Sequence, residues 1–151
     1  MIEITQFKSI RMLSYLTDEM LEKIEPITTI VDYKAGEYIF REGEYAEYLY
    51  SILEGDVGLE TEKHSSKRIL VTKITRGMTL GFSSLLDTDY RKYLGFAKAL
   101  TDTKLFAWKG VEMEKLFVRD YEMGFLIMRR IANIIHKRLQ ITMTQLVDIY
   151  Q

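Results

Sequence analysis

The hydrophobic pattern of this chain changes its period near Gly110. Before that point, from Tyr33 to Trp108, short apolar runs are separated by glycines, which is typical of short β-strands joined by turns. After it, residues 119–150 contain no proline and a single glycine, and apolar residues recur at every third or fourth position. That spacing predicts a long amphipathic α-helix. We therefore expect a mainly β structure with flanking helices and a long C-terminal helix.

The segment that precedes the strands predicts one short helix. Thr17 is suited to cap a helix N-terminus, and the acids Asp18 and Glu19 suit its first turn because of the helix dipole. The helix is expected to end near Pro26, since the residue before a proline is displaced from the helical region. β-branched residues follow over 27–33, which predicts a strand there.

Several short strands are expected between residues 36 and 108. The turn residues Glu54-Gly55-Asp56 lie between two alternating runs and predict a β-hairpin over residues 48–62. The other expected elements are strands at 36–44, 69–74 and 104–108, a polar loop at 64–68, a break at Gly77 and a short helix at 112–117. Strands of this length with regularly spaced turns are typical of a sandwich or jelly roll.

The C-terminal helix is longer than a small β-domain can cover, because about thirty residues span roughly 45 Å. Its apolar residues form one stripe at Met128, Ile131, Ile135, Leu139 and Leu146, and a second set at Ile127, Ile134 and Ile141. One set can pack on the sheets, and the other predicts a partner helix, so we expect a homodimer in which the stripe from Met128 to Leu146 faces the partner. We expect residues 1–118 to form the β-domain with its N-terminal helices, and residues 119–151 to form its helical extension.

The composition is that of one globular domain and excludes several kinds of chemistry. The 151 residues carry 21 basic and 22 acidic side chains, for a net charge of −1. The absence of cysteine excludes thiol catalysis, disulfides and thiolate metal sites, and two histidines supply little metal chemistry, so no metal is expected. Without a signal-peptide core or 18 consecutive apolar residues, the chain is expected to be cytoplasmic and not bound to a membrane.

The motifs of common enzymes are missing from the sequence. It has no phosphate loop, no dinucleotide-binding glycine motif, no nucleophile elbow and no HExxH zinc motif. His64 and His136 have no nucleophile or ligand partner at a recognisable spacing, and we interpret both as surface or packing residues. We therefore expect a protein that is not an enzyme.

A basic cluster lies on the long helix. Its members are Arg129, Arg130, Lys137 and Arg138. Such a cluster could contact DNA, but at helical spacing it is better interpreted as the solvated face of the helix. The nearly balanced charge of the whole chain also argues against a nucleic-acid partner.

Five segments, in this order, resemble a known family. They are GEYIFREGE at 36–44, the EGDVGL turn, GMTLGFSSLL at 77–86, ALTDTKLFAW at 99–108 and RRIANIIHKRLQIT at 129–142. Together they resemble cyclic nucleotide-binding domains, most closely the effector domains of the bacterial catabolite-activator type. The resemblance implies a double-stranded β-helix, or β-roll, flanked by helices, with a C-terminal dimer helix. The resembling transcription factors carry a helix-turn-helix domain after this helix; the sequence ends at Gln151, so no DNA-binding domain is expected in this chain.

The resemblance also implies a phosphate-binding cassette over residues 81–98. Where the family has an acid that accepts a hydrogen bond from the ribose hydroxyl, this chain has Phe82, which cannot accept one. The position of the family arginine stays open: alignment on the following strand gives Tyr93 and Leu94, whereas counting from the first glycine gives Arg91. The candidate ligand residues of the cassette are Gly81, Phe82, Ser83, Ser84, Arg91, Lys92, Tyr93 and Leu94.

Three hydroxyl side chains need separate consideration. Ser83 and Ser84 offer hydroxyls and amides to an anion at the start of a short helix, although a plain N-cap role for Ser83 explains the pattern equally well. Thr142 lies where the resembling dimer helices carry a threonine that contacts the nucleotide base, and Met143 follows where they carry a serine.

Two interpretations of the function remain. The first is a non-enzymatic sensor domain that binds a cyclic nucleotide (cAMP or cGMP) weakly, or another small anion, and signals through its C-terminal helix. Weak binding is expected because an unpaired hydroxyl and a lost bond to phosphate each cost about 1–3 kcal/mol. The alternative is a ligand-free dimerisation module whose pocket is closed by Phe82, Tyr93 and Phe96.

Overall fold

The structure is a computed structural model that describes residues 2–62, 64 and 67–150, so residues 65 and 66 of the expected polar loop lie outside it. Its helices are α1 (Ile4–Lys8), α2 (Asp18–Ile24), α3 (Gly110–Arg119) and α4 (Tyr121–Ile149). Short 3₁₀ turns are η1 (Arg11–Leu13), η2 (Glu25–Ile27), η3 (Phe82–Leu85) and η4 (Asp89–Arg91). The strands are β1 (Thr29–Tyr33), β2 (Tyr38–Phe40), β3 (Tyr48–Glu54), β4 (Val57–Glu62), β5 (Arg68–Ile74), β6 (Thr79–Leu80), β7 (Phe96–Ala99) and β8 (Thr103–Lys109).

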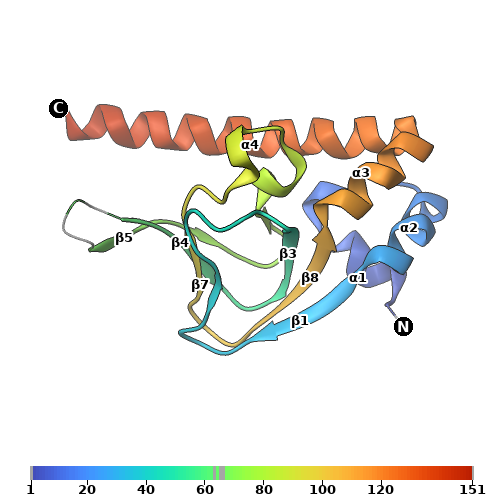
Figure 1. The fold of residues 1–151 in the computed structure, drawn as a ribbon, viewed down its shortest axis with the longest axis horizontal. Helices are drawn as coiled ribbons and strands as arrows, with labels where there is room; N and C mark the ends of the chain where they lie inside the picture. The colour runs from blue at the N-terminus through green and yellow to red at the C-terminus, as the bar shows by residue number, and fades with distance from the viewer. Residues whose placement is uncertain (1, 63, 65–66, 151) are drawn as a thin grey trace.

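Within the described residues, these strands form two four-stranded sheets with entirely antiparallel pairing. Sheet A has the order β1-β8-β3-β6, and sheet B has the order β2-β7-β4-β5. Helices flank the sheets at one end and α4 runs along the whole molecule (Figure 1). The expected fold, a β-roll with flanking helices and a long C-terminal helix, is therefore confirmed.

The expected hairpin over residues 48–62 is wrong. β3 pairs with β6 and β8, whereas β4 pairs with β5 and β7, so the turn carries the chain from one sheet to the other. Gly55 adopts a φ of 95°, and a Cβ atom there would lie 2.5 Å from the carbonyl oxygen of Asp102. The true hairpin joins β4 and β5, where Glu62 lies opposite Arg68.

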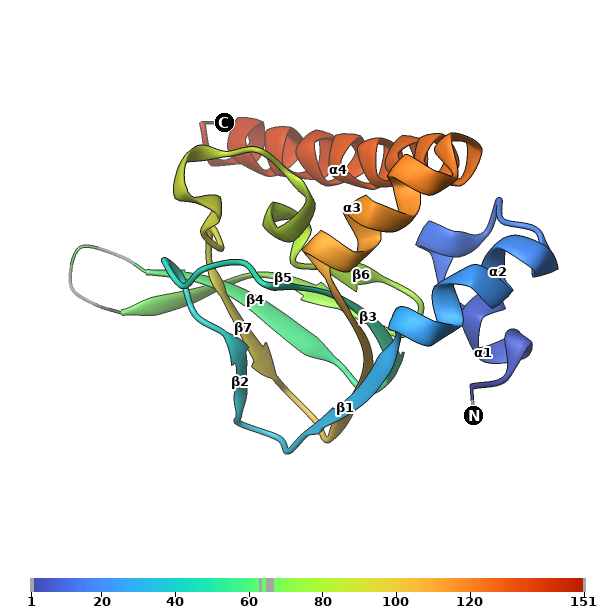
Figure 2. The ribbon, with the colours of Figure 1, turned by 45° about the vertical axis from the view of Figure 1, so that its right-hand side comes forward.

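The side chains of β3 and β8 alternate between two hydrophobic cores. Leu49 and Phe106 face the core formed with the helices, which also contains Trp108. Tyr50 and Leu105 face the interior of the β-roll. Sheet A is therefore the wall between the helical layer and the roll, as Figure 2 shows.

Helix α4 starts at a capped junction and packs on the helical core over its first turns. The Asp120 carboxylate accepts a hydrogen bond of 3.0 Å from the backbone N–H of Met123 and one of 2.9 Å from Lys23. The Met123 N–H and the Lys23 ammonium hold the Asp120 pKa below its usual value. Ile127 and Ile131 are buried against the core, so the expected partner-facing stripe needs a correction at Ile131.

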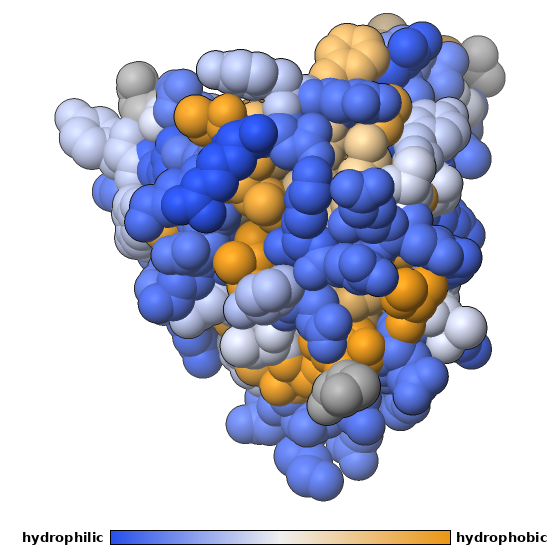
Figure 3. All heavy atoms as spheres, turned by 90° about the vertical axis from the view of Figure 1, so that its right-hand side faces the viewer, coloured by the Kyte–Doolittle hydropathy of each residue, from blue (hydrophilic) through white to orange (hydrophobic). Residues whose placement is uncertain are grey.

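Among the described elements, α4 carries the most exposed large apolar residues on the surface. Seen from the end where α1 and α2 lie, the surface is largely hydrophilic, with small apolar areas between hydrophilic side chains (Figure 3). On α4 the exposed large apolar residues are Tyr121, Phe125, Ile135, Leu139, Ile141, Met143, Leu146, Val147, Ile149 and Tyr150. None of the helices in the described part of the chain combines the length and apolar character that a membrane span requires.

Candidate functional site

A cavity of about 400 Å³ lies between sheet B, the segment that joins β6 to β7, and α4. The sheet supplies residues from β2, β4, β5 and β7, including Phe40, Leu59, Val71 and Phe96. The connecting segment, which carries η3 and η4, lies beside α4 in both ribbon views (Figures 1 and 2). This segment is the cassette that the sequence predicts, and five of its eight candidate ligand residues line the cavity.

The cassette begins with a glycine that the geometry requires. Gly81 adopts a φ of 86°, and a Cβ atom there would lie 2.8 Å from the carbonyl oxygen of Tyr48. η3 then begins at Phe82, and Phe82 and Ser83 line the cavity. Ser84 is fully buried and donates its hydroxyl hydrogen to the Gly81 carbonyl at 2.8 Å, so its hydroxyl supports the turn.

Tyr93 forms a fixed part of the cavity wall. Its ring stacks on Phe40 with 3.8 Å between ring centroids and 9° between ring planes. Its hydroxyl donates to the Tyr48 carbonyl at 2.6 Å and accepts from the Tyr48 N–H at 3.1 Å. Burial raises the pKa of Tyr93 to about 12. The next residue, Leu94, lies at the rim of the cavity and is 84% exposed.

Neither of the two candidate cations of the cassette lines the cavity. The Nη2 atom of Arg91 lies 3.0 Å from the Asp87 carboxylate and 2.8 Å from that of Glu114 on α3. These hydrogen bonds raise the Arg91 pKa, the bond to Asp87 most. Lys92 is exposed, with its ammonium 5.3 Å from the centroid of the Tyr90 ring. The structure thus ties Arg91 to α3 instead of pointing it at the cavity.

The cation that lines the cavity comes from α4. Arg138 is half-buried, so its expected place on the solvated face of the helix is wrong. Its Nη2 donates to the Thr79 carbonyl at 2.5 Å, and its guanidinium carbon lies 5.2 Å from the centroid of the Phe82 ring. Among the described residues, its Nε is a buried nitrogen without a hydrogen-bond partner. Burial lowers the pKa of Arg138.

Arg138 lies on the same face of α4 as two inward-packed isoleucines. Arg138 follows Ile131 and Ile134 at intervals of seven and four residues, and both isoleucines pack toward the body of the molecule. The other members of the basic cluster differ: Arg129 and Lys137 are exposed as expected. Arg130 is half-buried, and its Nε donates to the Arg11 carbonyl at 3.1 Å.

The remaining helix candidates divide between the cavity and the surface. Ile135 lines the cavity and is 39% exposed. Thr142 is exposed, does not line the cavity, and donates its hydroxyl hydrogen to the Arg138 carbonyl at 2.9 Å. Of the expected stripe, Met128 is half-buried, while Leu139 and Leu146 are 54% and 53% exposed.

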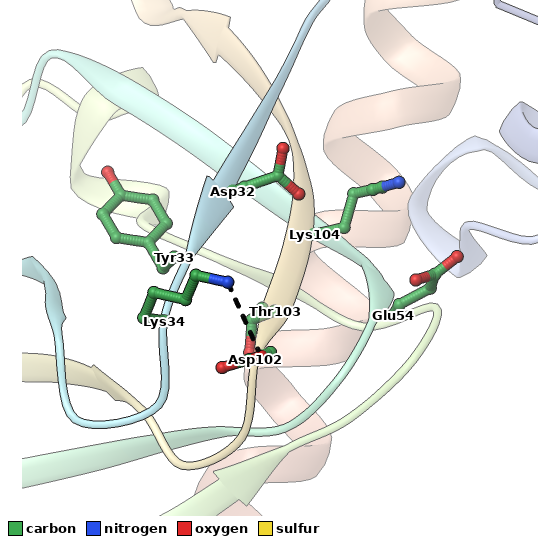
Figure 4. A pocket seen from close by; sticks show the side chains of 7 residues that line it. All are labelled: Asp32, Tyr33, Lys34, Glu54, Asp102, Thr103 and Lys104. Carbon is green, nitrogen blue, oxygen red and sulfur yellow. Dashed lines mark ion pairs between the residues drawn. The ribbon is translucent and has the colours of Figure 1, made fainter.

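A second depression, of about 330 Å³, lies at one end of strands β1, β8 and β3 of sheet A and is drawn in Figure 4. Its charged lining residues are Asp32, Lys34, Glu54, Asp102 and Lys104. Both signs of charge are present in it, and Lys34 lies 3.9 Å from Asp102. An open surface with mixed charges gives no preferred ligand, so we place the candidate site in the larger cavity.

The architecture defines the class of helix-flanked β-roll domains, with a cavity between a glycine-led segment and a long C-terminal helix. The chain belongs to the cyclic nucleotide-binding domain family: the sequence model described as "Cyclic nucleotide-binding domain" matches residues 30–120, more than half of the chain. No curated protein sequence matches it.

Solved structures with the same fold include proteins named as regulators. A candidate cyclic nucleotide-binding protein of Geobacter metallireducens is 27% identical, with a TM-score of 0.78 over 92% of this chain and 99% of that one. The catabolite activator protein of Thermus thermophilus is 22% identical, with a TM-score of 0.76 over 93% of this chain and 63% of that one. The sensor domain of the transcriptional regulator DNR from Pseudomonas aeruginosa is 18% identical, with a TM-score of 0.72 over 90% of each chain. The last two likenesses show the fold alone.

Proposed function

We propose that this chain is a regulatory domain that binds a small anionic molecule in the cavity and transmits binding through α4. The observation that carries the proposal is the shared cavity, of about 400 Å³, whose walls come from both the cassette and α4. Its volume lies within the range of small-molecule sites. Membership of the cyclic nucleotide-binding domain family supports this kind of ligand.

Cyclic nucleotides themselves are expected to bind weakly. Phe82 occupies the position at which the family places an acceptor for the ribose hydroxyl, and Arg91 is paired with Asp87 and Glu114. Each missing contact costs about 1–3 kcal/mol, so affinity falls by roughly two to four powers of ten. Another small anion that needs neither contact would bind better.

Signalling would follow from the position of α4. Ile135 and Arg138 contribute directly to the cavity wall, so a ligand would contact the helix itself. A ligand changes the position of a helix only if it binds one arrangement more tightly than another. In this proposal, residues 1–118 form the ligand-binding unit, residues 119–151 form the output helix, and the domain has no catalytic activity.

We also propose that the domain is a homodimer through α4. Leu139 and Leu146 are more than half exposed and lie seven residues apart, which is the repeat by which two helices pack along a seam. An apolar stripe that is exposed in the single chain is usually buried against a partner in the assembled protein.

The alternative, a module with a closed pocket, is not favoured. Phe82, Tyr93 and Phe96 line the cavity and leave about 400 Å³ open beside them. Tyr93 is held against Phe40 and Tyr48, so its ring is fixed in the wall.

A thermal-shift titration tests the proposal. The purified protein is titrated with cAMP and cGMP to millimolar concentration, with inorganic phosphate as a control for a nonspecific anion effect. Binding raises the melting temperature by a few degrees once the ligand exceeds its Kd many-fold. Val71 lies in the wall and is 47% exposed, so Val71→Trp fills the cavity from its open side and should abolish the shift. A shift that survives in Val71→Trp would contradict binding in this cavity.

A further inference from the structure

Among the described residues, two charged side chains line the cavity, and their partners differ. Glu60 is a hydrogen-bond acceptor for the Tyr38 hydroxyl at 3.2 Å, and Tyr38 in turn accepts from Arg68 at 2.6 Å. Arg138 has no carboxylate partner among the described residues and donates to a neutral carbonyl, that of Thr79. Within the described part of the chain, the cavity therefore contains a cation, Arg138, whose charge no carboxylate neutralises.

This cation is also incompletely hydrogen-bonded. Its Nε is buried and has no acceptor, although a guanidinium offers five N–H donors. A half-buried positive charge without a counter-ion is unfavourable unless another group supplies the negative charge. An anion with two or more oxygens, such as a carboxylate, sulfonate or phosphate, could accept from Nε and from a free terminal N–H together.

The rest of the wall is mainly apolar and aromatic. Leu59, Leu80, Phe82, Tyr93 and Phe96 line it, and the polar residues Thr61, Thr72 and Ser83 are few beside them. A ligand that fits this lining needs an apolar body, and the ring faces favour a flat one.

We propose that the cavity takes a small molecule with a flat apolar body and a single anionic group, and that the anionic group pairs with Arg138 on α4. The inference rests on the proposed function, since it names the ligand class of that same cavity. It places the charged end of the ligand at the output helix and the apolar end against the sheet and the cassette. The charge of the ligand would then act directly on α4.

A matched pair of fluorescent probes tests the inference. 8-Anilinonaphthalene-1-sulfonate has a flat aromatic body and one sulfonate, and N-phenyl-1-naphthylamine has the same body without the charge. Both are titrated against the full chain and against Arg138→Met, which keeps an unbranched apolar side chain and removes the charge. Arg129→Met is the control, because Arg129 is an exposed arginine of the same helix. Val71→Trp reports whether a probe occupies the cavity.

The inference predicts a specific pattern of affinities. Arg138→Met should weaken the sulfonate probe about ten- to hundred-fold and leave the neutral probe nearly unchanged, because one charge-assisted contact is lost. Arg129→Met should change neither affinity, and Val71→Trp should abolish both. Arg138→Lys should bind the sulfonate probe with an affinity between those of wild type and Arg138→Met, because it keeps the charge but loses the paired N–H donors. Circular dichroism of each variant checks that it is folded.

The contrary outcomes separate the inference from the proposed function. If Val71→Trp abolishes both probes but Arg138→Met keeps the sulfonate affinity, the cavity binds ligands and the role of Arg138 is refuted. Arg138 also borders a smaller cavity of about 200 Å³ with Arg11 and Lys137. Sulfonate binding that is lost in Arg138→Met but kept in Val71→Trp would place the anion there and overturn the inference. If the wild-type protein binds neither probe, both the inference and the open cavity of the proposed function fail.

Discussion

The guanidinium of Arg138 on α4 donates a hydrogen bond of 2.5 Å to the carbonyl of Thr79 on β6, a residue 59 positions earlier in the chain. The bond ties α4 to the β-roll at the edge of the cavity. An anionic ligand that pairs with the guanidinium would redistribute its hydrogen bonds, so ligand binding and the position of α4 would be coupled at this side chain.

The stability of the ligand-free protein should reflect the unneutralised charge of Arg138. We expect Arg138→Met to melt at the wild-type temperature or a few degrees higher, because removing a half-buried cation removes its desolvation penalty and loses one hydrogen bond to a neutral carbonyl. Thermal unfolding monitored by circular dichroism measures this. A drop of several degrees in Arg138→Met, with Arg129→Met unchanged, would show that the bond to Thr79 outweighs the cost of burial.

The Tyr93 hydroxyl should stabilise the cavity wall. Tyr93→Phe removes the donor to the Tyr48 carbonyl and the acceptor for the Tyr48 N–H, so we expect the free energy of unfolding to fall by about 1–3 kcal/mol. Urea denaturation measures this change. Tyr45→Phe is the matched control, because Tyr45 is 59% exposed and should give no change. Equal stability of the two variants would contradict a structural role for the Tyr93 hydroxyl.

Substituting two glycines that have similar backbone angles distinguishes the energetic cost of backbone strain from that of a steric clash. Gly36 and Gly81 have φ values of 92° and 86°, but a Cβ atom meets nothing within 4 Å at Gly36 and lies 2.8 Å from the Tyr48 carbonyl at Gly81. We expect Gly36→Ala to cost about 1–2 kcal/mol from strain alone. Gly81→Ala should cost clearly more and should also weaken probe binding, since the same carbonyl holds Tyr93. Equal losses in the free energy of unfolding, measured by urea denaturation, would mean that the cassette accommodates the added methyl group without a further energetic cost.

The junction before α4 should lose stability in acid. The Asp120 pKa is lowered in the folded protein, so the carboxylate stabilises the fold above its unfolded pKa and loses this effect as pH falls through the folded value. Asp120→Ala should therefore lower the melting temperature at pH 7. When the pH is lowered below 4, the melting temperature of this variant should fall less than that of the wild type. Asp120→Asn keeps an acceptor for the Met123 N–H, so its melting temperature at pH 7 should lie between those of the wild type and Asp120→Ala. Parallel acid profiles for wild type and Asp120→Ala would contradict this account.

The proposed dimer predicts the effect of charges on α4. The double variant Leu139→Glu with Leu146→Glu should be monomeric in light scattering at micromolar concentration, because two buried carboxylates per helix would face each other across the seam. Gln140→Glu with Gln145→Glu adds the same charge outside this pair of positions and should remain dimeric. A wild-type protein with the mass of a monomer would refute the dimer.

Much of the fold could be predicted because local patterns determine it. The period of the apolar residues indicates α4 to within two residues at each end, and glycine spacing locates most of the strands. The turn at Gly55 could not be assigned, because its local sequence fits a hairpin equally well. What decides its path is contact with Asp102, which is distant in sequence.

The candidate site, too, could be predicted only where local sequence determines it. Gly81 and the cassette could be located because a left-handed glycine and its neighbours form a local motif. The cation of the cavity could not be assigned from the cassette, since Arg91 pairs with Glu114 of α3 and Arg138 enters from a helix that starts after the last strand. Which of two helix faces turns inward depends on packing between elements, and spacing within one helix does not settle it.

Sheet A is the wall shared by the helical layer and the β-roll, so the unfolding of one of these layers is linked to the unfolding of the other. Leu49 and Phe106 lie in the helical core, while their neighbours Tyr50 and Leu105 lie in the roll. Separation of the helical layer would expose one side of strands whose other side forms the core of the β-roll. The domain should accordingly unfold cooperatively, as one unit, so a signal carried by α4 has to be a shift of the intact helix and not the melting of a detachable cap.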